Sequence, residues 1–267
     1  MSLLLSLLLI IGGCTATPTN PTFALTERQA RLAWDAMCDT PRPFERPVIV
    51  LGGIHDPGLV APNVARHLRE VSSEETLVVP ISFFTTGTFD ACRRRVLTVM
   101  DDTLPADDPE ETTEVDVVAV SMGGLVARHA ARAVAGERRL RVKRLFTIAT
   151  PHRGARLAEL PTFDRRILDM RSGSAFLARL NGNMHPDDPE LFPYTRLGDA
   201  IVGPERTAPP HQTPWWVPNP PLTFAHLTAA HDPRILADIA RRLRGEPPFA
   251  VTPPAPLPGG RGTAATP

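Results

Sequence analysis

A serine between a β-branched apolar run and a glycine-rich turn is the residue of this chain best placed for covalent chemistry. The run Val115–Val120 ends directly on Ser121, and Met122, Gly123 and Gly124 open a segment of helix-forming residues. A strand that stops on a serine and turns at once into a helix holds the serine in a tight corner, with its hydroxyl projecting from the sheet edge. The sequence predicts a nucleophile at Ser121; the alternative is a buried strand followed by an ordinary glycine-rich turn.

A serine hydroxyl is a weak nucleophile, so it needs a base to take its proton and a carboxylate to orient that base. His226 lies in the loop before a helix that opens on Asp232 and Pro233, where a base can reach the serine, so it is a candidate for the base. His231 is the competing histidine, because it lies only five positions further along the chain. Its position beside the helix cap favours a capping or solvent-exposed role instead.

The acid must lie where a carboxylate can be buried and hydrogen-bonded. Asp199 follows Gly198 at the end of a strand predicted over residues 194–197, and we expect it to be the acid. The alternatives, Asp187 and Asp188, fall in a proline-flanked loop whose polar residues are typical of a solvated surface.

These pieces resemble the α/β-hydrolase superfamily, in the branch of bacterial lipases and inositol-deacylase-like esterases. The matching segments are residues 118–124, 149–154 and 198–202, followed by His226, within a stretch of the chain from 46 to 243. The resemblance implies the chain order nucleophile, acid, base, which assigns Ser121, Asp199 and His226 as the catalytic triad. It also implies that His152, which precedes Asp199, shapes the floor of the pocket rather than serving as the base.

The resemblance also implies an oxyanion hole made of two main-chain N–H groups. One belongs to Met122, directly after the nucleophile, and the other to Ile54, after the Gly52-Gly53 pair that closes an earlier strand. The family has glycine where this chain has Ala119, and histidine where this chain has Gly52. We expect the first change to add only a methyl group, and the second to alter loop packing more than chemistry.

Strands and helices alternate through the body of the chain. Short apolar runs over residues 48–51, 77–81, 115–120 and 145–149 predict buried parallel strands, and the segments between them predict helices. This pattern predicts a single α/β domain over residues 25–245, built on a doubly wound, mostly parallel sheet. Residues 155–193 interrupt the alternation, as a short helical cap over the pocket or as ordinary helices packed outside the sheet. The aromatic residues Phe83, Phe84, Trp215 and Trp216 line an acyl pocket or complete the core.

The first residues are typical of an export signal. Residues 3–11 are apolar apart from Ser6, too short to span a bilayer, which needs about 20 apolar residues. They lead to Gly12, Gly13 and Cys14, an ending that resembles a bacterial lipobox in which the cysteine is lipidated. We therefore expect a signal peptide over residues 1–13, a lipidated Cys14 with a flexible tether over residues 14–24, and a location in the cell envelope. A plain cleaved signal, giving a secreted protein, is the alternative.

Two further expectations follow from export and composition. In an oxidising compartment the remaining cysteines, Cys38 and Cys92, are expected to form a disulfide, with two buried thiols as the alternative. Residues 246–267 are rich in proline, glycine, alanine and threonine and predict a disordered tail.

Composition excludes nucleic acid as a partner. The chain has 29 basic and 29 acidic residues and no net charge, so it lacks the basic surface that nucleic-acid binding needs. The sequence predicts a membrane-anchored serine hydrolase of carboxylic esters, with lipid esters as the expected substrates and no metal or cofactor. The alternatives are an acyltransferase, thioesterase or amidase on the same triad, and a non-catalytic envelope lipoprotein that keeps the fold.

Overall fold

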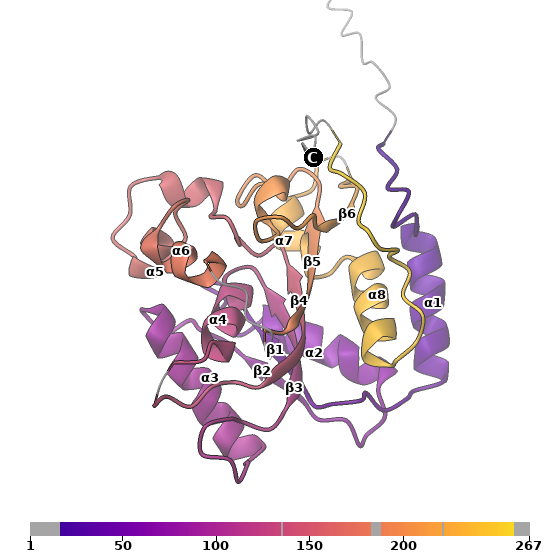
Figure 1. The fold of residues 1–267 in the computed structure, drawn as a ribbon. Coiled ribbons are helices and arrows are strands. Elements are labelled where there is room, and N and C mark those ends of the chain that lie inside the picture. Colours follow the sequence, from indigo (N-terminus) through magenta and orange to yellow (C-terminus); the bar gives the residue numbers. More distant parts are fainter. Residues whose placement is uncertain (1–16, 135, 183–187, 221, 259–267) are drawn as a thin grey trace, which may run out of the picture.

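A six-stranded parallel sheet forms the centre of the protein (Figure 1). The computed structural model describes residues 17–134, 136–182, 188–220 and 222–258. The strands lie in the order β2-β1-β3-β4-β5-β6, with bounds β1 Val48–Leu51, β2 Val78–Ile81, β3 Val115–Val120, β4 Val142–Ile148, β5 Glu190–Arg196 and β6 Trp215–Val217. The chain winds from β1 outward to β2, then returns past β1 to β3 and on to β6. The doubly wound α/β fold predicted from the sequence is confirmed.

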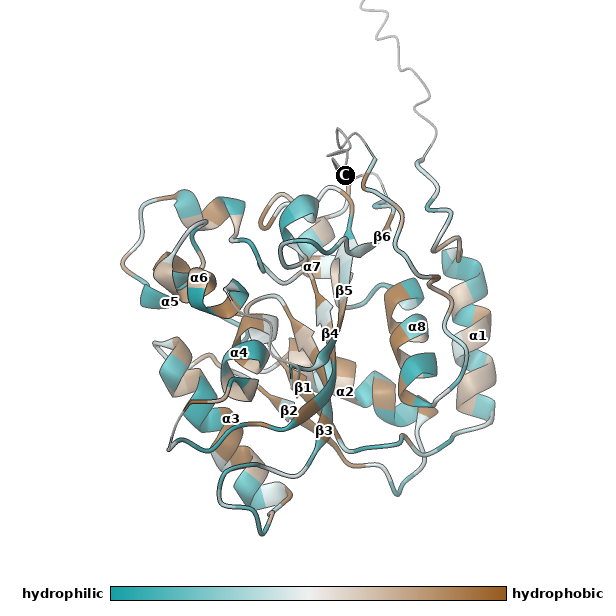
Figure 2. Ribbon diagram, viewed as in Figure 1, coloured by the Kyte–Doolittle hydropathy of each residue, from teal (hydrophilic) through white to brown (hydrophobic). Residues whose placement is uncertain are grey.

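Helices cover both faces of the sheet, as Figure 1 shows. One face carries α1 (Glu27–Asp39), α2 (Val60–Val71) and α8 (Pro233–Leu243). The other carries α3 (Phe89–Thr103) and α4 (Met122–Ala131). Because successive strand residues point to opposite faces, Val48 and Val50 pack in the core on the α1–α8 side, and Ile49 and Leu51 pack on the α3–α4 side. Parallel strands covered on both faces are rich in apolar residues, and Figure 2 shows brown, hydrophobic stretches in the central strands. The strand β1 is apolar throughout, whereas β3 contains Asp116 and β4 contains Lys143 and Arg144.

Over residues 155–182 the predicted insertion is a series of short helices, whereas its last residues, from Glu190, belong to β5. It contains η1 (Arg156–Glu159), α5 (Arg165–Asp169) and α6 (Ala175–Asn181), close to the short helices that the sequence predicted. Phe176 of α6 stacks on Phe89 of α3 with ring centroids 4.1 Å apart. The insertion therefore packs against the α3–α4 side of the molecule, and its first turn and Met170 also reach the cavity described below.

The strand β6 was not predicted from the sequence. Trp215 and Trp216 belong to β6 rather than to a loop, and both side chains are buried. A three-residue strand gives too short an apolar pattern to stand out among prolines. The two indoles and Phe83 complete the core, whereas Phe84 is exposed. None of these four aromatic residues lines the cavity beside Ser121.

The ends of the domain differ from expectation. Asn20 and Phe23, expected in a flexible tether, are buried, and the Asn20 side chain donates to the Trp216 carbonyl at 2.7 Å. At the other end, residues 246–258 do not form a free tail. The Trp215 and Trp216 indoles donate to carbonyls of Val251 and Ala255, and the Val251 N–H donates to Thr22. Their apolar side chains and backbone bonds fix this stretch against β6 and the chain before α1, so the prediction of disorder is corrected there.

The expected disulfide is not present. Cys38 and Cys92 are both free thiols. Cys38 packs with the core on the α1–α8 side, and Cys92 lies in the core on the α3–α4 side. The sheet separates them, so the prediction of a disulfide is wrong for a reason of topology. Burial raises the pKa of each thiol, which disfavours the reactive thiolate.

The predicted signal peptide, Cys14 and residues 259–267 lie outside the described residues. Within the part that is described, no helix is both long and apolar enough to cross a bilayer.

Candidate active site

Ser121 occupies a strained corner between β3 and α4. Its φ is 53° and its ψ is −125°, a conformation that costs free energy for any residue with a side chain. The Ser121 N–H donates to the Ile148 carbonyl of β4 at 2.8 Å, and α4 begins at the next residue. The backbone therefore turns sharply at Ser121, as the sequence predicted, at the carboxyl edge of the sheet.

Glycines make this corner possible. A Cβ on Gly123 would lie 2.6 Å from the carbonyl oxygen of Gly52, and a Cβ on Gly124 would lie 2.7 Å from Cγ2 of Thr150. Both distances are shorter than real Cβ contacts, so α4 approaches β1 and the turn after β4 only because these positions lack side chains. Ala119, which replaces the first family glycine, is fully buried in the core on the α3–α4 side. Its methyl group is accommodated there, as expected.

A chain of hydrogen bonds joins the three residues predicted as the triad. Ser121 Oγ lies 3.0 Å from His226 Nε2, and His226 Nδ1 lies 2.8 Å from Asp199 Oδ2. These distances fit one assignment of protons, in which Nδ1–H donates to the carboxylate and Nε2 accepts from the serine hydroxyl. Asp199 is 1% exposed, and its other oxygen accepts the N–H groups of Ile201 and Val202 at 2.9 Å.

The base lies in a short helix rather than in the loop expected for it. His226 belongs to α7 (Ala225–Ala229). His231 forms its side-chain contact with Asn63 of α2, 3.4 Å away, and burial lowers its pKa. The structure therefore brings His226, and not His231, to Ser121. Asp188 lines a different cavity, and Asp187 lies outside the described residues.

A buried ion pair that the sequence analysis missed supports α7. Arg196, the last residue of β5, donates to the Thr228 hydroxyl of α7, and its Nε lies 3.1 Å from Asp232 Oδ2. Asp232 also caps α8 and pairs with Arg234. The strand end that leads to Asp199 is thus tied to the helix that carries His226. An arginine three residues before the acid is too weak a pattern to have revealed this role.

The loop after β1 lies against the serine. A Cβ on Gly53 would be 3.3 Å from Ser121 Cβ, so glycine allows this close approach. Ile54 lines the cavity beside Ser121, and Met122 is the first residue of α4, where a helix N–H has no partner within the helix. Their assignment as the oxyanion hole stays a prediction.

Asp56 explains why this chain has Gly52 where the family has histidine. The Asp56 side chain accepts the N–H groups of Gly58, Leu59 and Val60 on Oδ1 and that of Ala61 on Oδ2, capping α2. A Cβ on Gly52 would lie 2.5 Å from Asp56 Oδ2. The Asp56 carboxylate therefore occupies the space that a side chain at position 52 would need, and this is the change in loop packing that we expected. An aspartate shortly before a helix was the available signal, and the sequence analysis did not use it.

Ser121 and His226 open onto a largely apolar cavity of about 370 Å³. His55 and Asp56 are the other ionisable residues that line it, and most of the remaining lining side chains are apolar, among them Met170 and Val202. Within the described ranges, no cluster of three or more His, Cys, Asp or Glu side chains could hold a metal ion.

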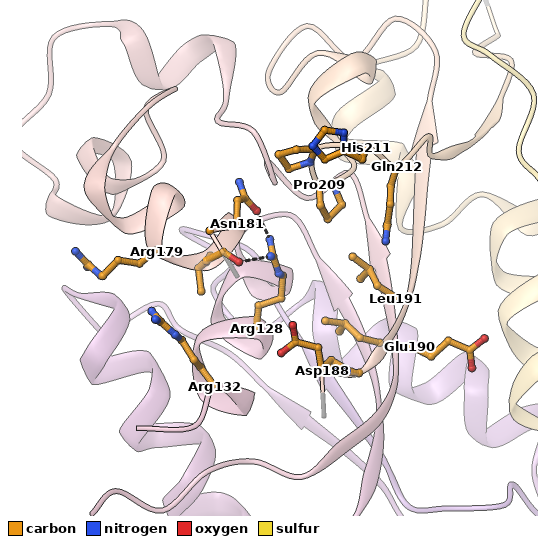
Figure 3. A pocket seen from close by; sticks show the side chains of 15 residues that line it. Arg128, Arg132, Arg179, Asn181, Asp188, Glu190, Leu191, Pro209, His211 and Gln212 are labelled. Atoms are coloured by element: carbon orange, nitrogen blue, oxygen red, sulfur yellow. Dashed lines mark hydrogen bonds between the residues drawn. The ribbon is translucent and has the colours of Figure 1, made fainter. Parts of the chain in front are cut away.

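A second cavity, of about 550 Å³, lies away from Ser121 and between α4, α6 and β5 (Figure 3). Arg128 of α4 donates to Asn181 Oδ1 at 2.9 Å and to the Leu180 carbonyl, which ties α4 to α6. Burial lowers the pKa of Arg128 to about 10, so the guanidinium stays charged at neutral pH. His152 is buried beside it, 3.2 Å from the guanidinium, and does not line the cavity at Ser121. The expectation that His152 shapes the floor of that cavity is wrong.

Comparison with known proteins agrees with this architecture. Residues 87–174, which include β3, Ser121 and β4, match the family described as the PGAP1-like alpha/beta domain. No curated protein matches the chain.

Solved structures similar to the chain include the mature lipase BlEst2 of Bacillus licheniformis, at 13% identity and a TM-score of 0.49 over 72% of this chain and 89% of that one. The RedJ thioesterase of Streptomyces coelicolor has 16% identity and a TM-score of 0.45 over 76% and 91%. An esterase of Pyrobaculum calidifontis has 15% identity and a TM-score of 0.42 over 82% and 90%. Identities this low carry no information about substrate. The doubly wound sheet, the strained serine between β3 and α4 and the family match over that same segment together show an α/β-hydrolase fold.

Proposed function

We propose that this protein is a serine hydrolase that cleaves carboxylic esters through an acyl-enzyme at Ser121. The observation that carries the proposal is the hydrogen-bond chain from Asp199 through His226 to Ser121, which ends in an apolar cavity. A scaffold has no need for a buried carboxylate, an imidazole and a strained serine in line. A nucleophile and its base within hydrogen-bond reach, with the base oriented by a third group, is the arrangement that activates a hydroxyl.

In the proposed reaction, His226 moves a proton at each step. As Ser121 Oγ attacks the ester carbonyl, His226 Nε2 takes the hydroxyl proton, and Asp199 stabilises the resulting imidazolium. The N–H groups of Met122 and Ile54 are proposed to bind the negative oxygen. His226 then gives its proton to the departing alcohol, which leaves the acyl group on Ser121. Water attacks the acyl-enzyme with His226 as base again, and the carboxylic acid leaves.

Lipid esters are the proposed substrates. An apolar acyl chain gains free energy when it leaves water for an apolar cavity, in proportion to the area buried. The lining around Ser121 supplies such a surface and has few polar groups other than the reacting ones. A short, soluble ester would bind through the same reacting groups but gain less from the cavity.

A fluorophosphonate probe tests the chemistry, because it labels only a serine that is activated as a nucleophile. Labelling of the purified protein is expected to disappear in Ser121→Ala, which changes one atom at the corner and leaves the fold intact. A series of nitrophenyl esters of increasing acyl length then tests the substrate class, and matched thioesters and amides test the bond. If the wild-type protein is not labelled, the hydrolase proposal is wrong.

We also propose that the protein is exported and held in the cell envelope by a lipid on Cys14. The supporting feature is the apolar run that ends in Gly12, Gly13 and Cys14. Mass spectrometry of the protein from a bacterial membrane fraction would give an acylated cysteine as the first residue. An unmodified N-terminus, together with recovery in the soluble fraction both for the wild type and for Cys14→Ser, would refute the anchor.

A further inference from the structure

Large hydrophobic side chains are exposed around the mouth of the cavity at Ser121. We define an apolar rim by six residues, Leu59, Leu157, Phe163, Leu222, Phe224 and Leu227. Phe163 and Leu222 are fully exposed, and the other four have between 49% and 79% of their surface in contact with water. Single exposed leucines need no explanation, but a group gathered at one place on a surface marks an interaction site.

Contacts with residues of the cavity place the rim at its mouth. Leu59 and Leu227 line the cavity themselves. Phe163 precedes Asp164, whose carboxylate lies 3.5 Å from the imidazole of His55, another lining residue.

The other rim residues are placed in the same way. The Leu157 N–H donates to the carbonyl of Ile201, which also lines the cavity. Leu222 and Phe224 lie just before the helix that carries His226. Two rim residues therefore line the cavity, and the other four lie next to residues or segments that line it.

The rim is uncharged on the side of α7. From Pro218 to Ala230 the chain contains no Asp, Glu, Lys or Arg, and His226 is its one titratable residue. Protein partners commonly meet a polar, hydrogen-bonding border around an apolar centre. The uncharged α7 side of the rim, at the entrance to an apolar cavity, instead fits the acyl region of a lipid layer, whereas Arg156, Asp164 and Arg165 lie beside the rim residues of the insertion.

The start of the described chain lies beside β6, the strand that leads into the uncharged stretch. Asn20 donates to the Trp216 carbonyl of β6, and Pro218, which opens the uncharged stretch, lies two residues beyond Trp216. Figure 1 shows the chain before α1 passing beside β6 at the end of the molecule where α7 lies. Cys14 is six residues before Asn20, so a lipid on it would be held within about 20 Å of this point. An anchor there would present the rim, rather than the opposite end of the molecule, to the membrane.

We infer that the apolar rim inserts into a lipid surface, so that substrate passes from the lipid layer directly into the cavity at Ser121. The entry of substrate rests on the proposed ester hydrolysis, whereas the insertion of the rim does not. Insertion of exposed Phe and Leu side chains is a hydrophobic effect, so it should depend little on salt or on the charge of the lipid headgroup.

Quenching by brominated lipids locates the inserted face. The full chain is used with Cys14→Ser, so that no lipid anchor contributes, and a tryptophan is placed either at Leu222 in the rim or at Leu77. Leu77 is an exposed apolar residue just before β2, at the opposite edge of the sheet. With vesicles of brominated phosphatidylcholine, the emission of Leu222→Trp is expected to fall well below that of Leu77→Trp. Equal quenching of the two variants would overturn the proposal.

Partitioning and turnover then measure what the rim contributes. Phe163→Ser/Leu222→Ser is compared with Leu77→Ser/Val134→Ser, which changes two apolar residues that lie away from the rim and are 39% and 42% exposed. The rim variant is expected to lose about tenfold or more in vesicle partitioning, with the control variant close to wild type. Hydrolysis of an ester embedded in vesicles should fall in parallel, and kcat/KM on a soluble short-chain ester should stay unchanged.

Other occupants of the rim give different results. Partitioning that requires anionic lipid and disappears in salt would show electrostatic binding and overturn the proposal. Absence of vesicle binding by the wild type would also overturn it. If the wild type were then a dimer that the rim variant converts to a monomer, a second copy would be the occupant. A wild type that binds vesicles but hydrolyses neither ester would refute the proposed function and leave the rim as a docking surface.

Discussion

The Asp56 carboxylate is expected to stabilise both the fold and the loop beside Ser121. It accepts backbone N–H groups at 3.1, 2.8, 3.0 and 3.3 Å, and the residue is 5% exposed. Loss of an exposed helix cap costs up to about 2 kcal/mol, and bonds to a charged acceptor are stronger when they are buried. Asp56→Ala should therefore lower the free energy of unfolding by about 2–3 kcal/mol.

Asp56→Asn provides the matched comparison. The amide oxygen can keep the place of Oδ1 and its three N–H partners, whereas the amide NH₂ cannot accept from Ala61. The expected loss is about 1 kcal/mol. Urea unfolding followed by circular dichroism measures both variants, and thermal unfolding should show the same order. An Ala variant within about 0.5 kcal/mol of wild type would refute the capping argument, since surface substitutions fall in that range.

Gly52 offers a sharper test, because its Cβ would lie 2.5 Å from Asp56 Oδ2. Gly52→Ala should destabilise the wild type by displacing the carboxylate, but should cost much less in Asp56→Ala, where no carboxylate is present. Residues that share one contact are expected to show a coupling energy of about 1 kcal/mol in such a cycle. Strictly additive effects would show that Gly52 does not make room for Asp56.

Three further outcomes are expected. His226→Ala should lower kcat on a soluble ester by about a thousandfold or more, whereas His231→Ala should stay within a few-fold of wild type. Steady-state kinetics measures both variants, and the opposite result would assign the role of base to His231. Gly124→Ala should lower the free energy of unfolding by about 1–3 kcal/mol, because its Cβ meets the Thr150 side chain, and an unchanged urea midpoint would contradict this. Burial and the nearby Arg128 hold the pKa of His152 well below its usual value, so the unfolded chain binds a proton that the folded chain rejects. The free energy of unfolding should be greatest above about pH 6.5 and fall as the pH drops below it, and His152→Asn should remove part of that slope.

The sequence was sufficient to predict the strand before Ser121, the serine itself as the nucleophile, and the order in which the acid and the base follow it along the chain. Four consecutive apolar residues, Val117 to Val120, lie directly before Ser121 and indicate a buried strand or a buried helix turn, and the glycines Gly123 and Gly124 favour a tight corner after it. Asp199 could be preferred over Asp187 and Asp188 because it follows the end of a predicted strand, where a carboxylate can be buried. These are local patterns, and the structure brings the predicted residues together.

Other features depend on residues far apart in the chain, which local patterns do not encode. Cys38 and Cys92 lie on opposite faces of one sheet, and no spacing between them reveals it. Residues 246–258 have the composition of a disordered tail, yet the Trp215 indole and the backbone of Thr22 supply hydrogen-bond partners for Val251. The fixed conformation of that segment comes from its neighbours rather than from its own composition.

The sequence by itself determined which chemistry this protein is equipped for, because a nucleophile, an acid and a base in a fixed order are properties of residue types. Only the tertiary structure decided how these groups are held and what surrounds them. Arg196 binds the helix that carries His226, and the Asp56 carboxylate fills the space beside Gly52. Six exposed hydrophobic residues form the rim of the cavity. The physical reason is that a hydrogen bond, a close contact and an exposed surface each depend on distances between segments. Those distances exist only after the chain has folded.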